Sequence, residues 1–477
     1  MYLPNFQLLL LNISNILLIH KKASKNNIHF IFTHTNKNGG IIMRNSIWSD
    51  KIEIPTRESL SRDIKTDVLI IGGGLCGILC AYFLHQKGID YILVEGNSIA
   101  SGITKNTTAK ITSQHGLIYS NLIKNYGKEK AQAYLLANEA ALSEYEKLSM
   151  SIDCDFEKRS SYIYSLNNTA KIEKEVTALN DLGLSASFVS ETELPFKING
   201  AVCVENQAQF NQLKFISAIS RNLNIFENTF VHQLAPHKAI TKNGTIEAKS
   251  IIVATHFPFL NKHGYYYLKL YQERSYVSAF ENVPALNGIY LDESSTGLSF
   301  RSYNDTMFIG GSSHRTGKQS PAWESLNYFA LKHYPNAKLK YEWATQDCMS
   351  LDKIPYIGLY SKNTPNLYVA TGFNKWGMTS SMVAAMILTD MIQVKENDFS
   401  EVFSPQRSIL KPQLLINGFE AAVNLLTPTA KRCPHLGCAL KWNKAEHTWD
   451  CPCHGSRFEE KGHLIDNPAM KNKFTKK

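Results

Sequence analysis

The sequence predicts an α/β protein of more than one domain, with a dinucleotide-binding domain toward the N-terminus and a small metal-binding module at the C-terminus. Three observations carry this prediction. The chain has 477 residues, more than a single hydrophobic core usually serves. Residues 67–95 read as a strand, a glycine-rich turn, a helix and a second strand. Residues 433–454 carry two short motifs of cysteine and histidine.

The N-terminal α/β unit begins with the apolar run 67–71, which is typical of a buried strand. It leads into the G-x-G-x-x-G of residues 72–77, and an apolar-periodic helix follows over 75–83. A second apolar run, 91–94, ends in Glu95. These glycines alone would be a weak signal, but within a complete βαβ unit they indicate a dinucleotide-binding site.

Each glycine of the turn has its own physical role. Gly72 permits the tight turn, Gly74 lets a pyrophosphate approach the backbone, and Gly77 lets helix and strand pack closely. The helix N-terminus offers free N–H groups to the phosphates, and Glu95 is placed to accept the ribose hydroxyls. The fingerprint by itself does not distinguish FAD from NAD.

Long helices are expected at two further places. Apolar residues recur on one face over 118–150, with Asn138 as the polar interruption. Pro412 opens a second helix that carries an apolar stripe, and Pro428 follows its end. The stripe consists of Leu415, Phe419, Ala422 and Leu426. We expect it to be a docking face rather than a membrane anchor.

The C-terminal motifs are a C-x-H at Cys433 and His435 and a C-x-x-H at Cys451 and His454. Two thiolates on one iron and two imidazoles on the other can bind a [2Fe–2S] cluster, which is the Rieske arrangement. Zinc could use the same four ligands, but zinc sites favour paired C-x-x-C motifs. The pattern therefore predicts a one-electron redox centre.

The surroundings of these ligands strengthen that prediction. C-P-H-L-G-C at 433–438 and C-P-C-H-G-S-R-F at 451–458 resemble the two cluster-binding loops of the Rieske family. The resemblance implies a disulfide between Cys438 and Cys453 that braces the loops. Because little sequence precedes Cys433, we expect a reduced all-β Rieske module that depends on its metal for stability.

Four segments favour FAD over NAD, because they resemble segments of the glycine oxidase/D-amino-acid oxidase superfamily. Residues 101–109 resemble its flavin loop, and 251–255 resemble a strand of its FAD domain. Residues 352–358 resemble its D-x-x-P-x-I-G turn, and 370–379 its last FAD motif. With the C-terminal match, the chain resembles the bacterial members of this superfamily that are fused to a Rieske domain.

The resemblance implies two cofactors, FAD and a Rieske [2Fe–2S] cluster. It also implies an α/β FAD-binding domain of the Rossmann-like, glutathione-reductase type, interleaved with an α+β substrate domain built on an antiparallel sheet. The residues expected to bind FAD are Gly72, Gly74, Gly77, Glu95, Thr104, Thr107, Thr108, Gly372, Gly377 and Thr379.

The expected domains are interleaved in sequence. The FAD-binding domain takes residues 66–117, 196–260 and 346–395, the substrate domain 118–195 and 262–345, the linker and docking helix 396–428, and the Rieske module 429–477. Residues 43–65 are expected to lie on the surface of the flavin domain. Residues 1–42 read as a translated leader or a disordered segment, with Met43 as the true start.

Composition narrows the function class. A net charge of +10 without aromatic residues interleaved along a basic stripe gives no support to nucleic-acid binding. The apolar patch near the N-terminus is too short and interrupted for a membrane span, and it lacks the basic flank and cleavage site of a signal peptide. Five cysteines outside the Rieske loops are scattered, as in a reduced cytoplasmic protein.

Two redox centres on one chain suggest a relay. We expect a dehydrogenase that oxidises an amine or amino acid at FAD and passes single electrons through the cluster to a ferredoxin-like carrier. An oxidase that reduces oxygen directly would not need the cluster. A reductase running the relay in reverse and a non-catalytic redox or iron sensor both stay open.

Candidate catalytic residues are His115, Arg301 and Lys375. His115 could tune the flavin or accept a proton, and a structural histidine is an equal alternative. Arg301 could bind a substrate carboxylate or form an ordinary salt bridge, with Arg274 as its runner-up. Lys375 lies inside the last FAD motif. Covalent attachment of flavin to Cys348 is not expected.

Overall fold

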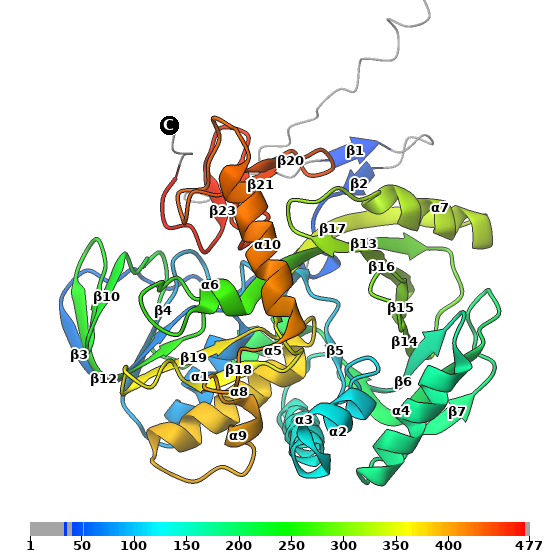
Figure 1. Cartoon of the computed structure of the whole chain (residues 1–477), viewed down its shortest axis with the longest axis horizontal. Coiled ribbons are helices and arrows are strands. Elements are labelled where there is room, and N and C mark those ends of the chain that lie inside the picture. Colours follow the sequence, from blue (N-terminus) through cyan, green and yellow to red (C-terminus); the bar gives the residue numbers. More distant parts are fainter. Residues whose placement is uncertain (1–32, 36–40, 51, 473–477) are drawn as a thin grey trace, which may run out of the picture.

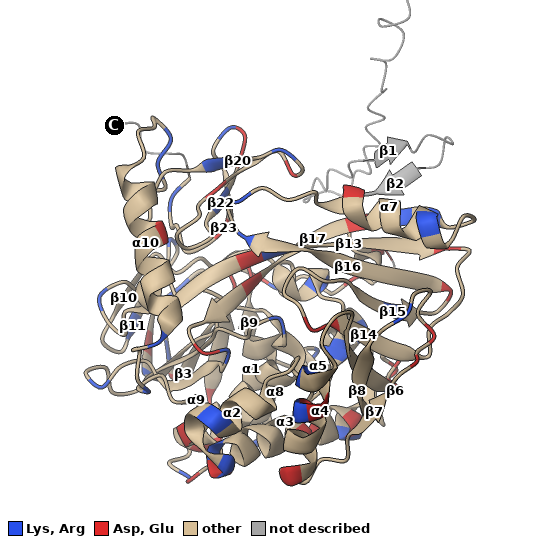
Figure 2. Cartoon of the chain, turned by 45° about the vertical axis from the view of Figure 1, so that its right-hand side comes forward, with Lys and Arg blue, Asp and Glu red and all other residues tan. Residues whose placement is uncertain are grey.

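The computed structural model describes residues 33–35, 41–50 and 52–472. The expected leader, residues 1–42, lies almost wholly outside the described residues. Two sheet-based lobes stand side by side, and the C-terminal module with its preceding helix sits above the junction between them (Figure 1). Basic and acidic residues are intermixed over the helices (Figure 2). No helix in the described part of the chain is long and apolar enough to cross a bilayer.

The first lobe is the predicted α/β domain. Five of its strands are parallel, in the order β9-β4-β3-β12-β19. The strands of this sheet are β3 (Ile64–Ile71), β4 (Tyr91–Val94), β9 (Ile225–Phe226), β10 (Gln233–Ala235), β11 (Lys238–Ile240), β12 (Thr245–Val253), β18 (Tyr356–Leu359) and β19 (Leu367–Thr371). The apolar runs 67–71 and 91–94 are buried strands, as predicted.

The second lobe is a mostly antiparallel sheet in the order β1-β2-β17-β13-β16-β15-β14-β6-β8-β5, with β7 paired to β8. Its strands are β1 (Thr33–Thr35), β2 (Ile41–Met43), β5 (Lys110–Ile111), β6 (Glu157–Ser165), β7 (Ser187–Val189), β8 (Gly200–Gln209), β13 (Leu270–Glu281), β14 (Gly288–Asp292), β15 (Ser299–Tyr303), β16 (Thr306–Arg315) and β17 (Lys338–Ser350).

Two predicted domain boundaries differ from this sheet. β8 pairs along its length with β6, so the return to the FAD domain expected at residue 196 falls too early. β17 continues to Ser350, past the boundary expected at 346. In both cases a strand that is continuous in the sheet crosses the point where sequence motifs change, and strand pairing cannot be read from one sequence.

The helices pack against the two sheets and, in part, against one another. They are α1 (Leu75–Gln86), α2 (Tyr119–Tyr126), α3 (Lys128–Ser149), α4 (Thr169–Asp181), α5 (Gln212–Ile219), α6 (Tyr266–Lys269), α7 (Trp323–His333), α8 (Gly377–Ile392), α9 (Ser400–Phe403) and α10 (Pro412–Leu426), with short 3₁₀ turns η1 (Ile47–Asp50) and η2 (Ile103–Asn106). The periodic stretch 118–150 forms α2 and α3, which Gly127 separates with a φ of +86°.

The segment expected to lie on the surface of the flavin domain is anchored more deeply than predicted. Trp48 is 1% exposed, and its Nε1 donates a hydrogen bond to the carbonyl oxygen of Thr107 at 2.8 Å. Residues 43–65 therefore contribute a core side chain behind the flavin loop.

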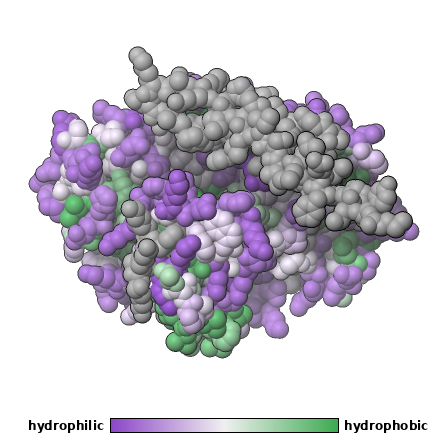
Figure 3. Space-filling model, turned by 90° about the horizontal axis from the view of Figure 1, so that it is seen from above, coloured by the Kyte–Doolittle hydropathy of each residue, from purple (hydrophilic) through white to green (hydrophobic). Residues whose placement is uncertain are grey.

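The C-terminal module is a small all-β unit, as predicted. Its four antiparallel strands are β20 (Lys441–Asn443), β21 (Thr448–Asp450), β22 (Arg457–Glu459) and β23 (Leu464–Asp466). Helix α10 begins at the proline that predicted it, but its apolar stripe does not face the protein. Leu415, Phe419 and Leu426 are 77%, 69% and 81% exposed, whereas Asn417 and Asn424 are buried. Seen from above, the molecule shows exposed hydrophobic surface at the lower edge of the view (Figure 3). The stripe is therefore exposed in this chain, and its assignment as a docking face stays a prediction.

Candidate redox site

A cavity of about 1130 Å³ lies where the two lobes meet the C-terminal module. The glycine-rich turn lines it on one side, the antiparallel strands β13 and β17 on another, and the end of the C-terminal module on a third. Of the residues expected to bind FAD, Gly72, Gly74, Glu95, Thr104, Thr107, Thr108, Gly372 and Gly377 line it. Gly77 and Thr379 lie behind this wall.

The glycine-rich turn has the geometry that a dinucleotide requires. Gly72 has a φ of +113°, and a side chain there would place its Cβ 2.5 Å from the carbonyl oxygen of Ala254. A Cβ on Gly77 would overlap the carbonyl oxygen of Gly72. At Gly74 the nearest atom to such a Cβ is Thr104 Oγ1, 3.3 Å away. The tight turn therefore requires glycine at position 72, and close packing of helix and strand requires glycine at position 77. Gly74 keeps the cavity wall open to a phosphate.

Glu95 and Thr104 are already tied to this turn. Glu95 Oε2 accepts a hydrogen bond from the backbone N–H of Gly73 at 2.6 Å. Thr104 Oγ1 accepts one from the N–H of Leu75, the first residue of α1, at 3.1 Å. Burial raises the pKa of Glu95, although backbone N–H donors oppose the shift. The residues present fit a dinucleotide along the N-terminus of α1.

His115 lines the cavity, but both of its ring nitrogens are engaged. Nδ1 lies 2.7 Å from the hydroxyl of Tyr134, and Nε2 lies 2.8 Å from the carbonyl oxygen of Thr112 and 3.0 Å from Thr379 Oγ1. The imidazole ring stacks on the ring of Trp376, with the two ring centroids 4.7 Å apart. Burial lowers the pKa of His115 to about 3. This environment suits a neutral histidine that fixes the last FAD motif better than one that accepts a proton.

Charged side chains meet on the cavity wall formed by β13 and β17. Glu273 and Asp347 are directly opposite each other in the strand register. Lys375 Nζ lies 2.9 Å from Glu273 Oε2 and 3.0 Å from Ser313 Oγ. Burial raises the pKa of Asp347 to about 6, even though Lys375 opposes the shift. Lys375 is therefore in the cavity, as predicted, and it is paired.

Lys110 of β5 lines the cavity together with Lys353 and Lys375, and no motif in the sequence predicted it. Burial, reinforced by the positive charge of Arg301, lowers the pKa of Lys110 to about 7. Among the described residues its ammonium group forms no salt bridge. The cavity thus presents the Lys110 amine near Asp347 and the Glu273–Lys375 pair.

The two arginines considered for carboxylate binding do not line the cavity. Arg301 is 1% exposed, donates through Nη1 to the carbonyl oxygen of Ala109 at 3.2 Å, and lies over the rings of Trp48 and Phe308. Arg274 is 2% exposed and pairs with Glu446 of the C-terminal module. The position of Lys110 makes it the better candidate for an anionic substrate group.

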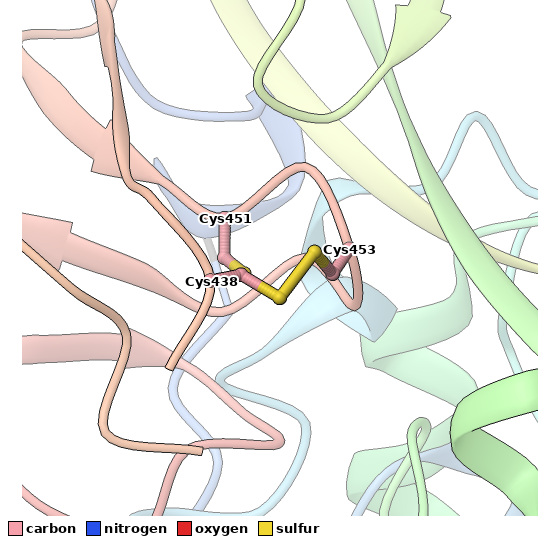
Figure 4. Close-up of side chains that lie close together, drawn as sticks. All are labelled: Cys438, Cys451 and Cys453. Atoms are coloured by element: carbon pink, nitrogen blue, oxygen red, sulfur yellow. A yellow bond between two sulfur atoms is a disulfide. The ribbon is translucent and has the colours of Figure 1, made fainter. Parts of the chain in front are cut away.

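The cysteines of the C-terminal loops divide as the resemblance implied. Cys438 and Cys453 form a disulfide, and the Cys451 side chain reaches toward it (Figure 4). The sulfur atoms of Cys438, Cys451 and Cys453 lie within 4.8 Å of one another. Because the disulfide consumes two of these sulfurs, Cys451 and Cys433, which hydrogen-bond to each other, are the thiols left to bind metal.

Both histidines of the loops have one free nitrogen. Their rings lie 4.9 Å apart, and in the described structure Nδ1 of His435 and Nδ1 of His454 are buried without hydrogen-bond partners. Unpartnered buried polar atoms are costly unless something binds them. Two thiols and two free imidazole nitrogens in one buried place fit the donor set of a Rieske cluster.

The opposite nitrogens of these histidines contact the segment between β12 and β13, which packs on the α/β lobe although its second half was assigned to the substrate domain. Nε2 of His435 lies 2.8 Å from Asn261 Oδ1, and Nε2 of His454 lies 3.0 Å from the carbonyl oxygen of Tyr267. The ring of Phe257 packs against both imidazoles. The edge of the metal site thus lies against the flavin-binding lobe and is partly buried there.

Comparison with known proteins agrees with this site. The model of the FAD dependent oxidoreductase family, DAO, matches residues 67–391, and that of the Rieske [2Fe-2S] domain matches residues 414–476. The chain belongs to the DAO family of FAD-dependent oxidoreductases. Its cofactors are accordingly FAD and, in the fused Rieske domain, a [2Fe–2S] cluster.

Individual relatives cover either the whole DAO–Rieske chain or one part of it. A putative Rieske 2Fe-2S iron-sulfur protein, YhfW, of Bacillus subtilis is 34% identical over 89% of this chain and 96% of its own. The cytochrome b6-f complex iron-sulfur subunit of Nostoc punctiforme is 51% identical, but only over 8% of this chain and 21% of its own.

Solved structures extend the likeness in fold. Glycine oxidase from Geobacillus kaustophilus has a TM-score of 0.62 and 18% identity, covering 72% of this chain and 99% of its own. L-proline dehydrogenase from P. horikoshii has a TM-score of 0.61 and 16% identity, covering 72% and 98%. At this level of identity they show that the DAO domain has the glycine oxidase-like fold.

Several site residues could not be found from motifs. Lys110, Glu273 and Asp347 come from strands, and which face of each strand meets the cavity depends on strand register. The end of the Rieske domain, which also lines the cavity, carried no signal for FAD binding. Sequence motifs report chain segments that bind a cofactor by themselves and miss segments brought to it by packing.

Proposed function

We propose that this protein is a cytoplasmic dehydrogenase that oxidises an amine or amino acid and delivers the electrons singly, through its Rieske domain, to an external ferredoxin-like carrier. When bound, FAD supplies two-electron oxidation and the [2Fe–2S] cluster supplies one-electron transfer. The observation that carries the proposal is the contact of the His435 and His454 edges with the flavin-binding lobe. This arrangement favours transfer within the chain.

A short hydrogen-bonded route supports transfer between the two sites. His256 lines the cavity, and its Nε2 lies 3.0 Å from Gln272 Oε1. The amide nitrogen of Gln272 donates to the carbonyl oxygen of His454 at 2.7 Å. Two residues, His256 and Gln272, therefore connect the cavity wall to the backbone of a proposed cluster ligand through direct hydrogen bonds.

The cavity chemistry supports an amino acid or amine as substrate. The Lys110 ammonium would bind a carboxylate, and Asp347 would bind the substrate amine and take its proton. Glu273, already paired with Lys375, would keep the local charge balanced. The names of structural neighbours, among them L-proline dehydrogenase and L-amino acid deaminase from Proteus vulgaris, agree with this substrate class.

The relay is tested by removing one proposed iron ligand. In His435→Ala, assayed with enough added FAD to keep the site occupied, reduction of the bound flavin in a single anaerobic turnover should be near normal, because no residue that lines the cavity is changed. Steady-state transfer to a ferredoxin or dye acceptor should collapse. Equal steady-state rates in variant and parent would show that the cluster is off the electron path and would favour a sensor.

The direction of flow needs a separate measurement. Anaerobic screening of amines and amino acids, with flavin and cluster absorbance followed together, should show flavin bleaching before cluster reduction. Reduction of the flavin only by a ferredoxin-like donor, with no response to any amine, would instead identify a reductase.

A further inference from the structure

The end of the Rieske domain takes part in the FAD cavity. Residues from His463 to Asn472, which include β23 and the segment after it, line the same cavity as Gly72 and Gly74 of the fingerprint. A dinucleotide lying along the glycine-rich turn would therefore be enclosed by two domains that are far apart in sequence.

One side chain fastens this segment to the FAD domain. Asn467 Nδ2 donates hydrogen bonds to the carbonyl oxygens of Thr255 and Phe257, at 2.8 and 2.9 Å. Thr255 lines the cavity and follows Ala254, whose carbonyl oxygen leaves no room for a side chain at Gly72. The segment is thus attached to the strand end that packs against the fingerprint turn.

The same segment is tied to the cluster-binding loops. The N–H of Ala469 donates a hydrogen bond to Ser456 Oγ at 2.9 Å. Ser456 lies two residues after the proposed ligand His454 in the sequence. Asp466 pairs with Arg457 at 3.2 Å. Any loosening of the 451–458 loop would therefore be transmitted to residues 463–472.

We infer that residues 463–472 complete the FAD-binding site, so that FAD is held tightly only while the Rieske domain is assembled around its metal. The domain is too small to bury a large core of its own and depends on its metal for stability. Loss of iron would release the segment and open one wall of the FAD cavity. The inference depends neither on the substrate nor on the direction of electron flow.

The direct test is FAD affinity in Asn467→Ala, measured by flavin fluorescence on the full-length protein. Two hydrogen bonds of ordinary net strength correspond to an increase in the FAD dissociation constant of about tenfold. Cluster absorbance should be unchanged, which shows that the Rieske domain is still folded. The matched control is Glu460→Ala, an exposed residue of the same domain that does not line the cavity.

A second arm removes the metal instead of the contact. Anaerobic chelation of iron from the parent protein should speed FAD dissociation, and restoring iron and sulfide should slow it again. If Asn467→Ala does not yield folded protein, Met470→Ala shortens another cavity-lining side chain with the same expectation. Parent-like FAD affinity in a folded variant, or full FAD retention after iron loss, would overturn the inference. Failure of the electron relay would leave these binding results unchanged.

Discussion

Glu446 joins the Rieske domain to the substrate sheet, and its removal should detach the two. Its carboxylate accepts from Arg274 Nε of β13 at 3.0 Å and from Arg457 Nη2 at 2.8 Å, and its side chain is 12% exposed. Burial opposes ionisation, but the two guanidinium groups outweigh it and hold the pKa of Glu446 at about 2. The ionised carboxylate is therefore part of the assembled structure.

The contribution of Glu446 to the free energy of unfolding follows from its lowered pKa. A decrease from the ordinary 4.5 to about 2 corresponds to ~3 kcal/mol in favour of the folded state at neutral pH. This contribution is complete above the unfolded pKa and is lost as pH falls through the folded value, that is, between about pH 4.5 and 2. Glu446→Ala should therefore destabilise the domain by ~3 kcal/mol, and it also leaves Arg274 buried without its partner.

Urea titration followed by cluster absorbance measures this effect. With a slope of about 1 kcal/mol per molar for a domain this small, the midpoint should fall by about 3 M. Glu459→Ala, an exposed carboxylate of the same domain, is the control and should shift little. Glu446→Gln should also remove the loss of stability between pH 4.5 and 2. A midpoint within about 0.5 M of the parent would refute this reasoning.

Three further outcomes are expected. Gly74→Val should abolish FAD binding, seen as loss of flavin absorbance, while cluster absorbance persists; stoichiometric FAD would count against the fingerprint. His454→Cys should lower the cluster potential in a redox titration by roughly a hundred millivolts or more, because a thiolate adds negative charge; an unchanged potential would contradict imidazole ligation. The kcat/KM for an amino acid should rise through about pH 6 as Asp347 ionises and fall above about pH 7 as Lys110 loses its proton. A rise through about pH 6 that persists unchanged in Asp347→Asn would exclude this assignment.

The cofactors could be predicted from the sequence because each is bound by contiguous loops. The turn 72–77 and the loops 433–438 and 451–458 carry their glycines, thiols and imidazoles at spacings that local geometry requires. The structure places each of these motifs at the expected element and closes the Cys438–Cys453 disulfide. Lys375 also lies in the cavity, since it belongs to such a loop.

Single side chains outside these loops have positions that depend on packing. Arg301 was expected near a substrate carboxylate. In the structure β15 pairs with β16, and the Arg301 side chain is buried and does not line the cavity. His115 lies in the cavity wall, where packing engages both of its nitrogens. The stripe of α10 faces solvent, because the buried face of that helix is formed by two asparagines.

By itself, the sequence determined that this chain binds a dinucleotide and an iron–sulfur cluster, because short-range backbone geometry and ligand spacing specify those sites. Only the tertiary structure decided which charges enter the cavity and how the two sites meet. The pairing of Glu273 with Asp347, and the position of Asn467 on the FAD domain, depend on contacts between segments far apart in the chain. Such contacts result from the packing of whole sheets, and no local pattern of residues encodes them.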